Sequence, residues 1–110
     1  MELLTKLEEL VLIAVLKLKD EAYGIAIYKF IMDITGKDVS VSSVYFPLER
    51  LVRKGLLRTS KGDPTPKRGG MSKRYYALTG PGIKALRENR SVSQAAWEGV
   101  TELLKNIPGV

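Results

Sequence analysis

The segment over residues 39–78 constrains the fold of this chain most strongly. A short amphipathic helix pattern opens it, and two stretches with the aromatic and alternating character of β-strands follow at residues 56–60 and 73–78. The twelve residues between these strands contain three glycines and two prolines. This loop is longer than the roughly two to five residues of a tight hairpin, which favours contact with a ligand or partner. A helix followed by such a hairpin is typical of a winged helix-turn-helix, so we expect an α+β fold that is mostly helical.

Two helices are expected before this segment. Thr5 and Glu8 have the spacing of a capping box, so the first helix is predicted to begin after Thr5 and to end near Leu18. Its apolar residues spread beyond one face, which indicates burial on two sides, one of them against a partner. The second helix is predicted over about residues 22–35. Its apolar stripe is expected to contain Ile25, Tyr28 and Met32.

The predicted C-terminal helix begins after Thr79 and has the spacing of a coiled-coil seam. Eight positions from Ile83 to Ile107 alternate steps of three and four residues, and six of them are apolar. A helix of about 25 residues cannot bury this stripe against so small a body, so we expect a homodimer. The predicted dimerisation residues are Leu3, Leu7, Ile83, Leu86, Trp97, Val100, Leu104 and Ile107.

The positive charge of the chain is concentrated in one segment. The formal net charge is +6, but residues 1–36 carry −2, residues 37–79 carry +7 and residues 80–110 carry +1. A solvated surface would mix its signs, whereas one strongly basic segment creates a local field suited to a polyanion. Duplex DNA is therefore the expected partner.

The residue inventory limits the chemistry that the chain can perform. It contains no cysteine and no histidine, which excludes disulfides, thiol nucleophiles, the usual zinc ligands and hydrolytic triads. No Gly-rich phosphate loop and no catalytic constellation stands out. We therefore expect no enzyme activity, no metal and no cofactor.

The apolar runs are too short for a membrane span. The longest candidate, residues 10–16, ends at Lys17, well below the roughly 18 residues that a span requires. Glu2, Glu8 and Glu9 precede this run, unlike the start of a signal peptide. We expect a cytoplasmic protein that does not bind membranes.

The helix over residues 43–54 is predicted to enter the major groove of DNA, because the second helix of such motifs does so. With Val44, Leu48 and Leu51 turned inward, its opposite face should present Ser43, Phe46, Pro47, Arg50 and Lys54. First-turn serines can bind phosphates, and an arginine can make a bidentate contact to guanine. The predicted DNA-binding residues are Ser42, Ser43, Tyr45, Phe46, Arg50, Lys54, Lys61, Lys67, Arg68, Lys73 and Arg74. Residues 1–79 thus form the expected DNA-binding domain, and residues 80–110 form the dimerisation helix, which packs with the first helix in one compact unit.

Two alternatives remain open at this point. The serines could simply cap a helix while the charges form a solvated face, although the basic hairpin argues independently against this. The chain could also be an architectural or nucleoid protein, which needs only phosphate contacts and no base readout.

The sequence resembles the PadR-like transcriptional regulators. The resemblance extends over nearly all of residues 5–90 and is carried by Ala22-Tyr-Gly-Ile25, residues 35–45, Leu48-Glu-Arg-Leu51, Lys54-Gly-Leu56, the hairpin loop over residues 62–70, Lys73-Arg-Tyr-Tyr76 and Leu78-Thr-Gly-Pro-Gly82. It implies a homodimeric winged-helix repressor that binds a pseudo-palindromic operator. The wing would lie on the DNA backbone, Tyr45 would belong to the recognition helix and the C-terminal helix would dimerise, as in the smaller subfamily. Phe46 and Pro47 depart from the small polar residues of relatives, so base preference should differ.

Trp97 allows two interpretations. A lone tryptophan on a seam is most often a packing anchor, because it buries a large area. Some members of the family that this chain resembles bind planar aromatic molecules at the dimer centre. The resemblance therefore also implies a possible effector site at Trp97.

Overall fold

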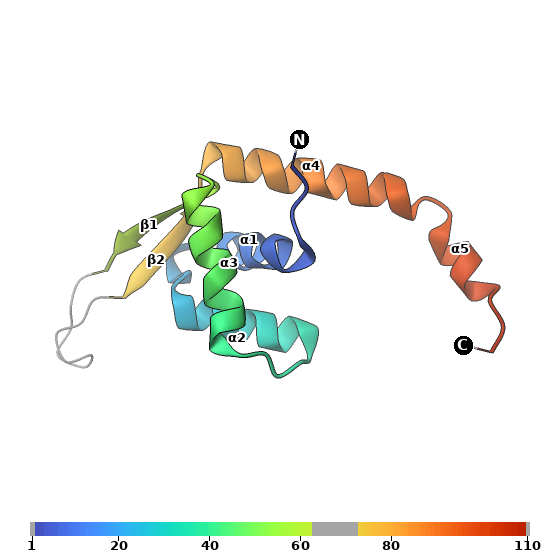
Figure 1. The fold of residues 1–110 in the computed structure, drawn as a ribbon, viewed down its shortest axis with the longest axis horizontal. Coiled ribbons are helices and arrows are strands. Elements are labelled where there is room, and N and C mark those ends of the chain that lie inside the picture. Colours follow the sequence, from blue (N-terminus) through green and yellow to red (C-terminus); the bar gives the residue numbers. More distant parts are fainter. Residues whose placement is uncertain (1, 63–72, 110) are drawn as a thin grey trace.

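The computed structural model describes residues 2–62 and 73–109. Its elements, in chain order, are α1 (Lys6–Leu18), the 3-10 turn η1 (Lys19–Glu21), α2 (Gly24–Thr35), α3 (Val41–Arg53), β1 (Leu57–Lys61), β2 (Arg74–Leu78), α4 (Gly80–Trp97) and α5 (Val100–Lys105). In Figure 1, α1 lies at the centre of the body between α2 and α4, and α3 crosses it. The two strands form a hairpin at one end, and α4 and α5 form an arm that extends beyond the other.

The core is built around α1, which contacts α2, α3, α4 and β2. Val11, Leu12 and Ala14 are fully buried, and Leu48 and Leu51 of α3 pack into the same cluster. The capping box is confirmed: the Glu8 amide donates to Thr5 Oγ1, and the Thr5 amide donates to Glu8 Oε1. Helix α1 thus packs against four elements of its own chain, and the expected contact of its other side with a partner stays a prediction.

The inward face of α2 differs from the predicted one. Ile27 and Ile31 are fully buried, whereas Ile25 is exposed to 45% and Met32 is only half-buried. Helical spacing fits either stripe. Ile27 and Ile31 form the buried stripe of α2, and the helix begins at Gly24, two residues later than predicted.

The start of α3 also needs a correction. We expected Ser42 or Ser43 to cap this helix, but Ser40 is the N-cap and accepts a hydrogen bond from the Ser43 amide at 3.3 Å. Both Ser42 and Ser43 therefore lie within the first helical turn and are exposed. Pro47 is buried rather than presented outward.

The hairpin is antiparallel, with Leu57 opposite Leu78 and Lys61 opposite Arg74. Each strand begins one residue later than its pattern predicted. Leu57 and Tyr76 face the core and are buried, which anchors the base of the hairpin. The helical body and two-stranded sheet confirm the predicted winged-helix fold, while most of the long loop lies outside the described residues.

The arm is not the continuous helix that the seam predicted. The chain leaves the helical conformation at Glu98 (ψ 118°), and Gly99 has a φ of +76°, which side chains other than glycine rarely adopt. Short α5 follows in a new direction (Figure 1), so the apolar seam is broken between Trp97 and Val100. Within residues 2–62 and 73–109, no helix is both long and apolar enough to cross a membrane.

Candidate nucleic-acid interface

Helix α3 presents one outward face beside the hairpin. We call α3 the recognition helix. Ser42, Phe46 and Arg53 lie on this face at helical spacing and are exposed. The serine hydroxyls form a small cluster, with Ser40 Oγ 2.6 Å from Ser43 Oγ and 3.3 Å from Ser42 Oγ. Such hydroxyls at a helix start can turn toward a phosphate without disturbing the core.

Tyr45 is on the recognition helix but does not project freely from it. Its ring is half-buried and lies against Gly24 at the start of α2. Burial of the phenol raises the pKa of Tyr45 above its usual value. The hydroxyl therefore lies at the margin between α2 and α3.

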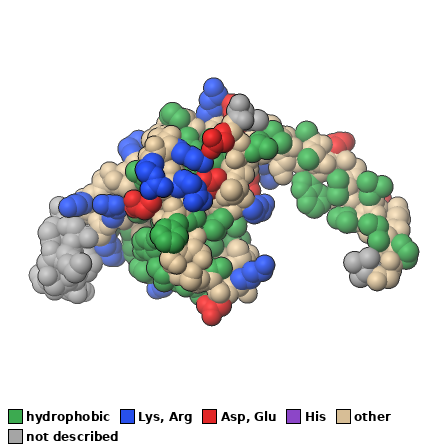
Figure 2. Space-filling view, in the orientation of Figure 1, with side chains coloured by type: hydrophobic (Ala, Val, Ile, Leu, Met, Phe, Trp, Pro, Cys, Tyr) green, Lys and Arg blue, Asp and Glu red, His purple; other side chains and the backbone are tan. Residues whose placement is uncertain are grey.

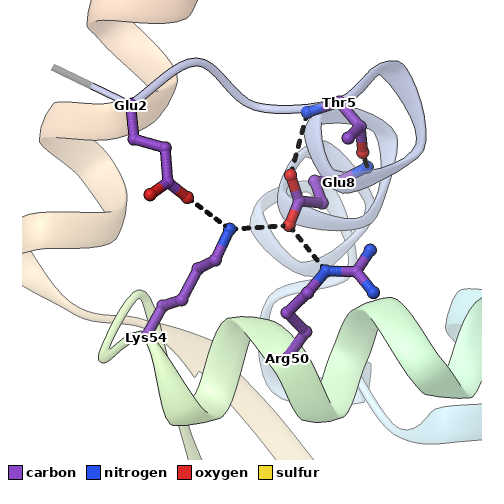
Figure 3. Close-up of polar contacts among 5 residues, drawn as sticks. All are labelled: Glu2, Thr5, Glu8, Arg50 and Lys54. Atoms are coloured by element: carbon purple, nitrogen blue, oxygen red, sulfur yellow. Dashed lines mark hydrogen bonds and ion pairs between the residues drawn. The ribbon is translucent and has the colours of Figure 1, made fainter.

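Arg50 and Lys54 lie on the side of the recognition helix that adjoins α1, and 40% and 33% of their side-chain surfaces stay exposed. Arg50 Nε donates to Glu8 Oε2 at 3.0 Å, and Lys54 Nζ donates to the same oxygen at 3.2 Å (Figure 3). Lys54 also pairs with Glu2 at 2.6 Å, which brings the N-terminal segment to the same cluster. These ion pairs connect α1 and the N-terminal segment to the end of the recognition helix.

Glu8 is a buried charge whose hydrogen bonds keep it ionised. Its side chain is 2% exposed. Burial disfavours the charged form, but hydrogen bonds from the Thr5 amide, Arg50 and Lys54 outweigh it and lower the pKa of Glu8 from 4.5 to about 2. Hydrogen bonds to Glu2 and Glu8 raise the pKa of Lys54. Glu8 and Lys54 are therefore both charged at neutral pH.

The base of the wing adds a second group of cations. Lys61, Lys73 and Arg74 lie where the two strands open into the loop. Lys73 Nζ sits 3.8 Å from the centre of the Tyr23 ring, and Arg74 pairs with Glu49 of the recognition helix at 3.4 Å. The last contact ties the wing to α3, so the two elements can approach one ligand together. Lys67 and Arg68 lie outside the described residues.

Lysine and arginine side chains gather over the recognition helix and continue along the base of the wing in Figure 2. Two exposed cations, Arg53 at the end of α3 and Arg58 on β1, are not among the predicted DNA-binding residues. Their place in the +7 segment was the available signal. Glu8 was missed as a partner of α3, because nothing local connects residues 42 positions apart.

The predicted dimerisation residues do not share one environment. Leu7 and Leu86 pack partly against the core, and Val100 is half-buried. Leu3, Ile83, Trp97, Leu104 and Ile107 are exposed, each to at least 40% of its surface. Leu103, which the seam did not include, is exposed to 67%.

A groove of about 700 Å³ lies beside this surface, between α1, β2 and α4. Its apolar floor includes Leu16, Ile83 and Leu86, and Arg87 and Arg90 lie at its edge. Helix α4 is held over α1 by a hydrogen bond from Asn89 Nδ2 to Glu9 Oε2 at 2.7 Å. Within the described residues, no cluster of acidic side chains could hold a metal ion.

The family model of the PadR-like transcriptional regulators matches residues 12–88 of this chain. No curated protein matches this chain. Among solved structures, a PadR-like transcriptional regulator from Bacillus cereus superposes with a TM-score of 0.75 at 23% identity, over 92% of this chain and 93% of that chain. A PadR family regulator from Eggerthella lenta superposes with a TM-score of 0.67 at 28% identity, over 89% of this chain and 83% of that chain. A PadR family regulator from Clostridium difficile superposes with a TM-score of 0.65 at 21% identity, over 96% of this chain and 100% of that chain.

Proposed function

Because the chain belongs to the PadR-like family of transcriptional regulators, we propose that this DNA-binding regulator is a homodimeric repressor of a pseudo-palindromic operator. The observation that carries the proposal is the placement of exposed cations and serines on α3 and on the adjoining wing base. The recognition helix would enter the major groove, which is about 12 Å wide and admits one α-helix. The wing would follow the phosphate backbone beside it.

The proposed DNA contacts are revised by the ion pairs of the recognition helix. Ser42, Ser43, Phe46 and Arg53 are free to face the groove, and Tyr45 borders it. Arg50 and Lys54 are proposed to hold the helix in place through Glu8. Phosphate contacts are assigned to Lys61, Lys73, Arg74, Lys67 and Arg68.

Dimerisation is proposed from the exposed apolar residues of the arm. Trp97, Leu103 and Leu104 lie on a part of the chain that extends away from the body (Figures 1 and 2). Apolar area of this kind is unfavourable in water and is removed from it by a second copy of the arm. A two-fold dimer presents two recognition helices, so its operator should contain two inverted half-sites.

Repression follows most simply from occupancy. A dimer that covers two half-sites excludes other proteins from that DNA. The rival function is an architectural protein that binds any duplex through phosphates alone.

Selection of bound duplexes from a random pool tests the proposal. We expect an enriched inverted repeat with half-sites about 34 Å apart, or one helical turn. Affinity for this sequence should exceed affinity for random duplex by about 10³ or more. Equal affinity for both would support the architectural protein, and a single asymmetric site would contradict the dimeric operator.

A planar aromatic effector is a second proposal, supported by the 55% exposure of Trp97. Two such rings at a dimer centre would offer stacking surfaces. Tryptophan fluorescence titrated with planar aromatic compounds tests it. Quenching that also changes DNA affinity supports the effector, whereas a spectrum unchanged by every compound removes it.

A further inference from the structure

We propose that the recognition helix reads thymine methyl groups and that Phe46 is the specificity-determining residue. The inference rests on the proposed function, because it assumes that α3 enters the major groove. It adds which chemical group of the operator is recognised and by which side chain.

Phe46 is the most exposed large hydrophobic side chain among the described residues, with 68% of its surface in water. It lies on the second turn of α3, one turn after Ser42 and on the face opposite Val44, Leu48 and Leu51, which are fully buried. The core is therefore complete without it. An aromatic ring left in water at the centre of a binding face indicates contact with an apolar group of the ligand.

The polar side chains around Phe46 are held by other contacts. Arg50 is bound to buried Glu8 at 3.0 Å, and Glu49 pairs with Arg74 at 3.4 Å. Tyr45 leans away from the helix against Gly24. Phe46 therefore forms the largest exposed apolar surface in the middle of the helix.

The charges that flank Phe46 favour nucleic acid over a protein as its partner. Arg53 is exposed on the same face, and Lys61 and Arg74 lie at the adjoining wing base. The core of a protein interface centred on Phe46 would be depleted of charge, whereas cations flank this side chain. The remaining large exposed hydrophobic side chain of α3, Val41, lies in the first turn and extends the apolar surface only along the helix.

Base chemistry then selects the target. In the major groove, thymine is the only one of the four bases that presents a methyl group, and phenylalanine is among the side chains that contact it. Cytosine has only a hydrogen atom where thymine has its methyl group, and its amino group nearby is a hydrogen-bond donor. A half-site read by Phe46 should therefore require thymine at one or two positions.

The test starts from the enriched operator and replaces each thymine in turn by deoxyuridine, which lacks only the methyl group. We expect the wild-type protein to lose affinity about fourfold per contacted methyl, at the same position of both half-sites, and nowhere else. Phe46→Ala should bind the thymine operator as weakly as wild type binds an operator substituted at the contacted position of both half-sites, with no further loss on substitution. Phe46→Leu should retain part of the discrimination, because it keeps an apolar contact.

Ile34→Ala is the matched control, since Ile34 is an exposed apolar side chain on α2, 59% in water. It should keep the full sensitivity to deoxyuridine. Thermal unfolding of each variant shows whether the fold is retained, which we expect because Phe46 is 68% exposed.

The outcomes separate the two proposals. If selection enriches no sequence, the proposed function and this inference both fail. If an operator is enriched but deoxyuridine has no effect, or its effect persists unchanged in Phe46→Ala, the proposed function stands and methyl recognition by Phe46 is wrong.

Discussion

The phenol ring of Tyr45 lies directly against the α-carbon of Gly24, so that a Cβ at position 24 would fall 2.7 Å from Tyr45 Cζ and 2.9 Å from Cε1. Gly24→Ala must therefore displace the ring from its place between α2 and α3. We expect a loss of folding free energy of about 1–3 kcal/mol, as for an overpacked site. Chemical denaturation measures it.

A second substitution should reverse the sign of this effect. In a Tyr45→Ala background the added methyl group meets no ring, and alanine favours a helix over glycine by about 0.5–1 kcal/mol. Gly24→Ala should then be neutral or stabilising. Gly80→Ala, at a helical position with open space around it, is the control in the wild-type background. Equal destabilisation by Gly24→Ala in both backgrounds would contradict the contact.

The buried Glu8 carboxylate predicts a pH-dependent stability. Its folded-state pKa of about 2 lies below the usual 4.5, so ionised Glu8 stabilises the fold above pH 4.5 and loses this effect as the pH falls toward 2. This shift of the Glu8 pKa corresponds to about 3 kcal/mol of folding free energy at neutral pH. Glu8→Gln should therefore be much less stable than wild type at pH 7, and the difference should shrink through the acid range.

The comparison with wild type isolates Glu8 from the other carboxylates that titrate in acid. Glu102→Gln is the control, since Glu102 forms an exposed pair with Lys105 at 3.5 Å, and such pairs contribute little. If the stability of Glu8→Gln stays below that of wild type by the same amount from pH 7 to pH 2, the carboxylate acts through its shape and not through its charge.

Replacing Lys61 at the wing base should weaken the salt dependence of DNA binding. If Lys61 neutralises one phosphate, Lys61→Met should make the negative slope of log affinity against log salt shallower by about 0.9, equally for operator and random DNA. Lys84→Met on α4, where the side chain is 78% exposed, should leave the slope unchanged. A change in base preference with an unchanged slope would assign Lys61 to base readout instead.

Short-range patterns predicted most of the fold. The Thr5–Glu8 capping box, the strands and the helix order depend on residues within a few positions of one another, and each was found within about two residues. The apolar seam after Thr79 was different, because a spacing of three and four continues through position 99 whether or not the helix does. The extended ψ of Glu98 and the positive φ of Gly99 interrupt the helix there.

Long-range partners could not be read from the sequence. Arg50 and Lys54 have the spacing of an outward face on an isolated helix, and their ion pairs with Glu8 depend on how α1 crosses α3. A charged residue inside the first apolar stripe was the only hint that α1 holds a buried carboxylate. The recognition surface that remains, with Phe46 at its centre, became visible only after those cations were placed.

Exposed Trp97 and Leu104 predict that the arm controls the oligomeric state. They are 55% and 54% in water, so the double variant Trp97→Ala/Leu104→Ala should keep the fold of the chain while removing a large part of the proposed dimer contact. Tryptophan truncation at an interface commonly costs about 2 kcal/mol, so we expect dimerisation to weaken by more than about 30-fold. Sedimentation velocity over a range of concentrations measures this, with Glu102→Ala on α5 as the control. The variant should also lose its advantage for a two-half-site operator over a single half-site. A wild-type protein that stays monomeric while bound to its operator, or a double variant that remains dimeric, would contradict the role of the arm.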